Sequence, residues 1–326
     1  MTTTTSQTVR GSQFTEINRP SRSLWGDAWA RLKRNRAALA SLFVIAFFAL
    51  VAIFAPLLAP RSPVEQSQNN GQRQPFWVHT DNPRTTGSTD YLFGTDSIGR
   101  DVLSQLIYGS RVSMVVGVVP IFFTATIGIV VGLVAGFAGG RLDNLLMRFT
   151  DIVYAFPDLL FIITLATAFR DSFLGNAWNG LLLIFLALTI ISWTSMARLV
   201  RGQVLSLKQK EFIESARAVG VSTPRILFRH ILPNALGPVI VAATFAIPSA
   251  IVGEAILTFL GVGLKPTLDP NSAFPTSWGA VLLDGYYNIN ASPWTLVFAV
   301  VCIGALTISF TFLGDGLRDA LDPRDQ

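Results

Sequence analysis

The sequence has few of the residues from which catalytic and metal sites are usually built. Its single cysteine, Cys302, lies in an apolar run, so an internal disulfide is impossible and no oxidising compartment is indicated. The two histidines, His79 and His230, lie far apart with no cysteine beside them, which argues against a metal site. The chain contains no GxxxxGKS/T phosphate loop, no GxSxG and no HExxH. We therefore expect no catalytic residue, no cofactor of its own and no ATP hydrolysis by this chain.

Charged residues are also scarce. They make up 14% of the 326 residues, whereas 51% are hydrophobic and the mean hydropathy is +0.49. Because soluble domains carry about 25% charged residues, this composition indicates a membrane protein. The net charge of +5 would suit nucleic acid. The positions of the basic residues indicate a topology signal instead, so we expect no nucleic-acid partner.

Six apolar runs are long enough to cross the hydrocarbon core of a bilayer as helices. We therefore expect an all-α integral membrane protein with six transmembrane helices. In the second run, Gly128, Gly132 and Gly136 recur every four residues on one helix face, which predicts the close approach of another helix. The runs cover residues 38–60, 112–138, about 152–169, 178–197, about 235–260 and 294–313.

The basic residues favour one orientation of these spans. If the N-terminus is cytoplasmic, 18 of the 25 Lys and Arg residues lie in cytoplasmic segments. This predicts that both termini and the polar loop 205–233 are cytoplasmic and that segment 61–108 is external. The chain then divides into a cytoplasmic N-terminal tail (1–37), the first transmembrane helix with the external segment (38–110), spans two to six (111–314) and a cytoplasmic C-terminal tail (315–326).

The N-terminal tail changes character along its length. Residues 1–22 are polar and rich in Thr and Ser. From residue 24 to 36, Trp25, Ala28, Trp29 and Leu32 recur at the spacing of one helix face among several basic residues. This pattern is typical of an amphipathic helix lying on an anionic leaflet of membrane lipid. A plain basic flank of the first span explains it equally well.

Loop 205–233 is predicted to form two short helices. Ser206 can cap the first, which stops at Gly220, a residue suited to the left-handed position after a helix. Thr223 can cap the second, with Pro224 at the first helical position. Pro233 then prevents the second helix from continuing smoothly.

The first of these helices carries a small apolar face. Phe212, Ala216 and Val219 share that face, beside several charged residues. A short helix of this kind outside a membrane requires a groove on a partner protein.

A second polar motif precedes the second span, at residues 93–103. Gly94 and Gly99 allow tight turns, and Asp96, Arg100 and Asp101 can pair with one another or cap a short helix over 102–108. We interpret this motif as architectural and not as a substrate contact.

Several of these motifs resemble those of a known protein family. Glu214-Ser215-Ala216, then Gly220, then His230-Ile231-Leu232-Pro233 after nine residues, resemble the EAA loop of ATP-binding-cassette (ABC) importer permeases. Ser215 replaces the second position of that pattern, and His230 stands where the pattern has Ile. Segments 93–103, 229–234 and 314–324 resemble the dipeptide/oligopeptide (peptide/nickel) permease branch.

The resemblance implies a type I importer permease fold with cytoplasmic coupling helices, in a bacterial cytoplasmic (inner) membrane. Two homologous permease chains would form the pathway for dipeptides or oligopeptides, and an extracytoplasmic peptide-binding protein would deliver the substrate. Two cytoplasmic ATPase subunits, which bind ATP and Mg, would contact the EAA loops. The coupling-loop residues implied here are Glu214, Ser215, Ala216, Gly220, His230, Leu232 and Pro233.

An ion-coupled secondary transporter acting alone is the alternative. Such a carrier needs ionisable groups near the middle of the membrane. Glu254 is the sole candidate, and it lies near the external end of the fifth span. It either faces a cavity, where it contacts peptide or gates the outer mouth, or it pairs with a neighbouring chain or faces water at the interface.

Overall fold

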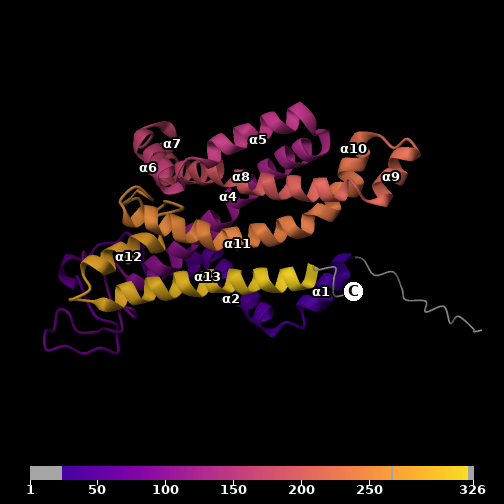
Figure 1. Cartoon of the computed structure of the whole chain (residues 1–326). Helices are drawn as coiled ribbons and strands as arrows, with labels where there is room; N and C mark the ends of the chain where they lie inside the picture. The colour runs from indigo at the N-terminus through magenta and orange to yellow at the C-terminus, as the bar shows by residue number, and fades with distance from the viewer. Residues whose placement is uncertain (1–23, 266, 322–326) are drawn as a thin grey trace, which may run out of the picture.

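The computed structural model describes residues 24–265 and 267–321, and the regular elements within them are all helical, so the all-α prediction is confirmed (Figure 1). The expected tail 1–22 and residues 322–326 of the C-terminal tail lie outside this part. The elements are α1 (Leu24–Leu32), α2 (Arg36–Ile53), α3 (Ala55–Leu58), the 3-10 turn η1 (Gln68–Asn70), α4 (Val102–Ala138), α5 (Gly140–Tyr154), α6 (Asp158–Ala168), α7 (Phe173–Asn176), the 3-10 turn η2 (Ala177–Gly180), α8 (Leu181–Leu207), α9 (Glu211–Ala218), α10 (Thr223–Ile226), the π-helical turn η3 (Leu227–Ile231), α11 (Leu232–Phe259), α12 (Trp278–Tyr287) and α13 (Pro293–Leu321).

Five candidate membrane spans are built around α2, α4, α8, α11 and α13, and α5 with α6 provides a sixth if the bent pair counts as one span. The third expected span is therefore not one straight helix over 152–169. The pair is bent by 77°, and α6 alone has 11 residues. Pro157 explains the break, because it lacks a backbone N–H and disfavours the α conformation at Phe156.

Helix α4 is longer than the second expected span. Segment 102–108, expected as a separate short helix, forms its first turns, and the helix runs for 37 residues. The boundary placed between residues 110 and 111 therefore falls inside a helix. Asp101 caps this helix as expected, since its Oδ2 accepts a hydrogen bond from the backbone N–H of Ser104 at 2.8 Å.

The glycine face of α4 packs against α8, as the spacing predicts. A methyl group at Gly128 would lie 2.6 Å from Cβ of Met196, and one at Gly132 would lie 2.6 Å from the carbonyl oxygen of Ala197. At Gly136 it would lie 2.8 Å from Cβ of Val204. The two helices therefore approach more closely than any larger residue at these positions would allow.

The fourth span begins and ends later than expected. Trp178 and Asn179 adopt positive φ values of 52° and 58°, so the regular helix starts at Leu181. It then continues ten residues beyond Ala197 to Leu207. The prediction that Ser206 caps a helix was wrong, because Ser206 lies in the last turn of α8. The charged residues after Ala197 indicate that the helix passes from lipid into water, but they do not interrupt it.

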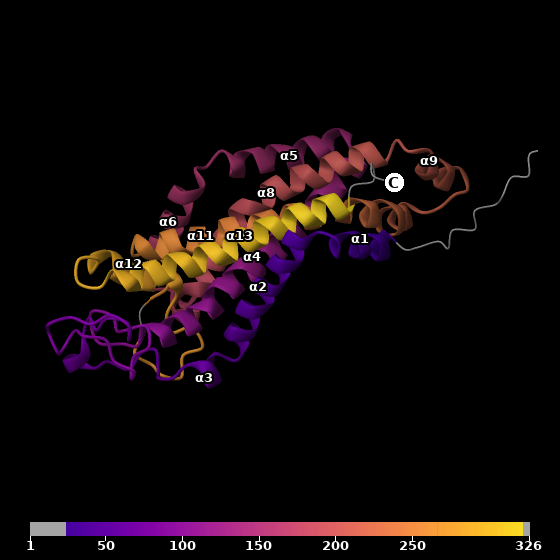
Figure 2. The ribbon, with the colours of Figure 1, turned by 90° about the horizontal axis from the view of Figure 1, so that it is seen from below.

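The molecule has two distinct ends. In Figures 1 and 2, segment 59–101 and α12 lie at one end, whereas α1, α9 and the C-terminal end of α13 lie at the other. At this second end, Ala28 and Leu32 of α1 are buried with Ala38 and Ala320. Part of the apolar face expected to rest on lipid thus packs on the protein, while Trp29 remains 47% exposed.

Candidate functional site

Loop 205–233 contains two short helices, as predicted. The first, α9, ends in a left-handed residue, Gly220, with φ of 77°. The N–H of Val221 donates to the carbonyl of Ala216 and the N–H of Gly220 donates to that of Arg217, both at 3.0 Å. These two bonds form a Schellman motif, and they confirm the conformation predicted for Gly220.

Helix α9 is anchored on the protein by one side only. Ile213 and Ala216 are buried at 0% and 7% exposure, in a cluster that includes Val204 of α8, Ile226 and Ile231. The apolar face expected for a partner is therefore divided. Ala216 packs inward, and the residues that anchor the loop, chiefly Ile213, were missed. Their apolar i, i+3 spacing in α9 was the signal that could have identified them.

Phe212 and Val219 point away from this cluster, with exposures of 45% and 78%. Glu214, Ser215 and Gly220 are exposed beside them, and a methyl group at Gly220 would meet nothing within 4 Å. Glu211 is exposed as well, so the exposed part of α9 presents two carboxylates, two apolar side chains and a bare turn. Its chemistry suits a protein groove rather than a small-molecule ligand.

The second helix of the loop differs from the prediction in two ways. Its N-cap is Ser222, not Thr223, so Pro224 is the second helical residue and not, as expected, the first. The chain then passes through η3 directly into α11, with the N–H of Leu232 bonded to the carbonyl of Leu227. This wider turn accommodates Pro233, which has no N–H and would otherwise crowd the carbonyl four residues earlier. His230 lies half-buried in η3, and Leu232 and Pro233 begin α11.

Basic side chains tie loop 205–233 to the end of α4. Lys208 Nζ donates to the carbonyl of Gly136 at 2.9 Å, one of the carbonyls left free where α4 ends. The guanidinium of Arg217 lies 5.4 Å from the ring centroid of Phe137. Movement of α9 would therefore be transmitted to α4 as well as to α8 and α11.

Glu254 neither faces a cavity nor lies at the surface of the chain, where it could pair with a neighbouring chain or face water. It is 1% exposed, inside the chain between α11 and α12, where its Oε1 accepts a hydrogen bond from Thr258 at 2.7 Å and Ser277 also hydrogen-bonds to it. A buried carboxylate held by two hydroxyl groups fixes the junction of these two helices. It lines neither of the two large pockets of the described chain.

The motif at 93–103 forms a buried polar network. Asp96, 2% exposed, accepts hydrogen bonds from the backbone and Nε of Arg100, the latter at 2.6 Å, and from Gln105 Nε2 at 2.9 Å. Gly94 and Gly99 have φ of 79° and 83° and make the expected turns. This geometry fits the architectural interpretation.

Asp101, next to that network, is 2% exposed, and its Oδ1 has no hydrogen-bond partner. Burial raises the pKa of this carboxyl above its usual range, although its bonds to Ser104 act in the opposite direction. Among the described residues, no group of three or more His, Cys, Asp and Glu side chains is arranged to hold a metal ion.

Comparison with protein families gives two matches. The family described as the binding-protein-dependent transport system inner membrane component matches residues 128–324. A second family, described as the N-terminal TM domain of oligopeptide transport permease C, matches residues 23–75.

Curated relatives match almost the whole chain. The oligopeptide transport system permease protein OppC of Haemophilus influenzae is 40% identical over 95% of this chain and 92% of its own length. OppC of Escherichia coli is 42% identical over 94% of this chain and 93% of its own. The dipeptide transport system permease protein DppC of Bacillus subtilis is 38% identical over 94% and 88%.

A solved structure shares the fold. The chain resembles an inward-facing structure of the MetNI methionine ABC transporter with a TM-score of 0.54 and 21% sequence identity. The match covers 68% of this chain and 97% of that one. At this level of identity the likeness concerns the fold alone.

Proposed function

The chain belongs to the family of inner-membrane components of binding-protein-dependent transport systems, and on this premise we propose that it forms one half of the peptide pathway of an ATP-driven importer. As a permease subunit it is not itself an enzyme. The observation that carries the proposal is the 38–42% identity to oligopeptide and dipeptide permeases over 94–95% of the chain. No relative named above is an ion-coupled carrier acting alone, so that alternative has no support.

In the complete transporter, this chain would contact four kinds of partner. A homologous permease subunit completes the pathway, and two ATPase subunits supply the ATP and Mg sites. An extracytoplasmic binding protein delivers peptide at the end that contains segment 59–101, and membrane lipid surrounds the helices. Both termini and loop 205–233 lie on the cytoplasmic side of the inner membrane. Helices α1 and α9 and the C-terminal end of α13 lie at one end of the molecule, which supports this orientation.

Helix α9 is the contact for the ATPase in this proposal. Its outer side, with Phe212, Glu214 and Val219, fits a groove on the ATPase, while Ile213 and Ala216 hold the helix to the permease. When ATP closes the two ATPase subunits, α9 is displaced as a rigid body. Because the same cluster contains residues of α8 and α11, the displacement tilts those spans between inward-facing and outward-facing states.

Variants of loop 205–233 test the proposal, because loss of ATPase docking can be distinguished from loss of folding. We expect Gly220→Asp and Glu214→Lys to insert into the membrane normally but to uncouple ATP hydrolysis from peptide uptake by the assembled transporter. Gly220 requires a left-handed conformation that Asp adopts at some cost, so strain must be controlled for. Gly261→Asp is the matched control, because Gly261 follows α11 with φ of 78°, the same pair of hydrogen bonds and open space around it, but lies outside loop 205–233.

Asp315→Lys serves as the control for charge reversal, since Asp315 is exposed on α13 at the same end of the molecule. We expect both control variants to transport like the wild type. Normal uptake by Gly220→Asp and Glu214→Lys would refute the coupling role. A chain that transports in liposomes without any ATPase would refute the importer assignment altogether.

A further inference from the structure

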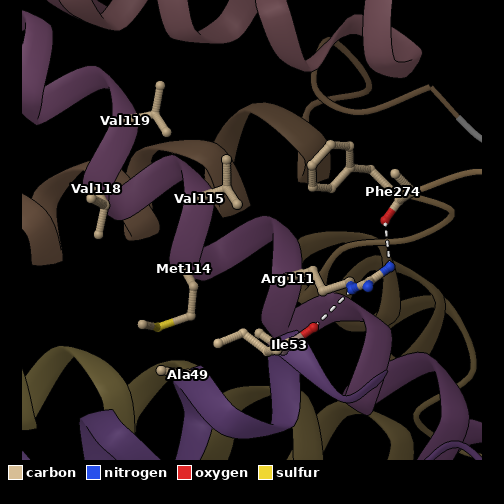
Figure 3. Close-up of a pocket in the computed structure, with 10 residues that line it drawn as sticks. Ala49, Ile53, Arg111, Met114, Val115, Val118, Val119 and Phe274 are labelled. Atoms are coloured by element: carbon tan, nitrogen blue, oxygen red, sulfur yellow. Dashed lines mark hydrogen bonds between the residues drawn. The ribbon is translucent and has the colours of Figure 1, made fainter. Parts of the chain in front are cut away.

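An apolar pocket lies between α2 and α4, far from loop 205–233. Its volume is about 480 Å³, and Figure 3 shows side chains of both helices around it. The walls are apolar except at one end, where the side chain of Arg111 lies. Ile53 and Val118, at the rim, are 64% and 49% exposed, so the pocket opens sideways on the surface of the chain.

Arg111 is the charged group of this pocket. Its Nε donates to the carbonyl of Ala52 at 2.8 Å, and its Nη1 lies 3.4 Å from the carbonyl of Ala273. The guanidinium lies 5.5 Å from the ring centroid of Tyr108. All these partners are neutral, and none of the ion pairs formed within the described residues involves Arg111. A permanent positive charge thus stands at one end of an apolar groove without an anion.

The depth of Arg111 in the membrane follows from the helices. Helix α2 has 18 residues, about 27 Å, which nearly matches the hydrocarbon core of about 30 Å. Arg111 contacts the last turn of α2 and immediately precedes the apolar run 112–138 of α4, so it lies near the boundary between hydrocarbon and headgroups. The apolar walls run from there toward the bilayer centre, because Met114, Val115, Val118 and Val119 follow Arg111 along α4 for about 12 Å (Figure 3).

We infer that this pocket holds an anionic phospholipid of the surrounding bilayer, with its phosphate at Arg111 and an acyl chain between α2 and α4. The charge lies at the headgroup level and the apolar walls lie below it, which matches the polarity of a phospholipid. The lipid would belong to the leaflet on the same side as segment 59–101. The bound lipid would join α2 to α4, which otherwise meet here across the open pocket. This inference does not depend on peptide transport.

Native mass spectrometry of the full-length chain in mild detergent tests the inference. The probes are phosphatidylglycerol and a diacylglycerol with the same acyl chains, which lacks the phosphate. We expect the wild type to retain phosphatidylglycerol preferentially and Arg111→Gln to lower that retention about fivefold without changing diacylglycerol retention. Arg111→Lys should restore most of the preference, because it keeps the charge.

A second variant guards against misfolding of Arg111→Gln, since Arg111 also binds the end of α2. Val118→Phe should fill the groove and lower retention of both lipids, whereas Val130→Phe, on the same helix at an exposed site outside the pocket, should lower neither. Unchanged retention in Val118→Phe, or an unchanged preference for phosphate in Arg111→Gln, would overturn the inference. So would a photoreactive residue at position 118 that crosslinks to the second permease chain, instead of phospholipid, in the assembled transporter.

Discussion

A methyl group added at Gly132 would lie 2.6 Å from the carbonyl oxygen of Ala197, whereas one added at Gly202 would meet nothing within 4 Å. Both glycines lie inside long membrane helices, where glycine is otherwise unfavourable. The difference lies entirely in what surrounds them. At Gly132 a second backbone blocks the space, so the missing side chain determines the distance between α4 and α8.

This contrast predicts opposite effects of one substitution. We expect Gly132→Ala to destabilise the protein by about 1–3 kcal/mol, because backbone atoms of α8 cannot move aside cheaply. Gly202→Ala should be neutral or stabilise by up to about 1 kcal/mol through helix propensity. Thermal unfolding of the purified proteins in detergent measures both. Equal unfolding midpoints for the two variants would contradict the role assigned to the glycine face.

Much of this residue-scale detail could be predicted from the sequence. The positive φ values of Gly94, Gly99 and Gly220 were predictable, because glycine placed after polar or helical segments signals such turns. The positive φ values of Gln72, Trp178 and Asn179 were not. These residue types do not demand the conformation, which is imposed by neighbours distant in sequence, such as Lys265, whose N–H bonds to the carbonyl of Asn179.

At the scale of elements, ion pairs hold the bent α5–α6 pair against α8. Arg201 donates from Nε and Nη2 to both carboxylate oxygens of Asp143, at 2.6 and 2.7 Å. Arg198 pairs with Asp151 at 2.9 Å, and its guanidinium lies 4.1 Å from the ring centroid of Tyr154. These contacts place α5 beside α8, the helix that leads into loop 205–233.

A double-mutant cycle measures the stronger of these pairs. We expect Asp143→Asn and Arg201→Gln each to lower the unfolding midpoint, and the double variant to lose less than the sum of the two. A coupling free energy of about 0.5–2 kcal/mol is expected for a bidentate, partly exposed pair. The more exposed pair Asp151–Arg198, at 56% and 38% side-chain exposure, should show a smaller coupling and provides the comparison. Additive losses at Asp143 and Arg201 would mean that this ion pair does not contribute to holding α5 against α8.

A different contact joins segment 59–101 to α12. Asp284 of α12 accepts hydrogen bonds from the backbone and hydroxyl of Ser97. Burial raises the pKa of Asp284 above its usual range, and the charge of Asp96 acts in the same direction, whereas the bonds to Ser97 and the charge of Arg100 act against it. Folding therefore favours the protonated form of Asp284 relative to the unfolded chain.

The sign of the pH dependence follows from that shift. Since the folded-state pKa lies above the unfolded value of about 3.9, the stabilisation is complete below that pH and is lost as pH rises through the folded-state pKa. Asp284→Asn imitates the protonated carboxyl and cannot ionise. We expect it to unfold at a higher temperature than the wild type at pH 7.5 and at nearly the same temperature near pH 4. A less stable variant at pH 7.5 would show that the ionised carboxylate is the favoured form.

The helix boundaries show the limit of prediction for whole elements. Hydropathy located the five spans built around α2, α4, α8, α11 and α13, because it reports which residues lie in lipid, but it did not predict that the third expected span is the bent pair α5–α6. It located the C-terminal end of α4 at Ala138 but not the start of α4 or the end of α8, since these helices extend into polar surroundings with no proline to stop them, and Gly109 and Gly202 do not interrupt them. It also missed α12, whose Trp278 is buried and donates from Nε1 to the carbonyl of Leu106 at 2.8 Å, a contact between residues far apart in sequence.

At the scale of the whole molecule, two ends of different chemistry face the two sides of a membrane. One end has irregular chain from residue 59 to 101, and the other has α1, α9 and the end of α13 (Figure 2). The distribution of Lys and Arg predicts that the second end is cytoplasmic. The coupling role of α9 requires this orientation, because ATP is available only there.

Labelling of single cysteines tests the orientation directly. The chain has one cysteine, Cys302, which is partly buried in α13, so Cys302→Ala gives a background without thiols. Asp81→Cys and Ser215→Cys then place one thiol at an exposed site at each end. In intact cells whose outer surface is accessible, we expect a membrane-impermeant maleimide to label position 81 and to leave position 215 unlabelled until the membrane is opened.

The reverse pattern would place α9 outside the cell, where it could not meet an ATPase, and the importer mechanism would fail with it. Labelling of both positions before lysis would point to leaky membranes, which a cytosolic protein with an exposed cysteine, labelled in parallel, would reveal.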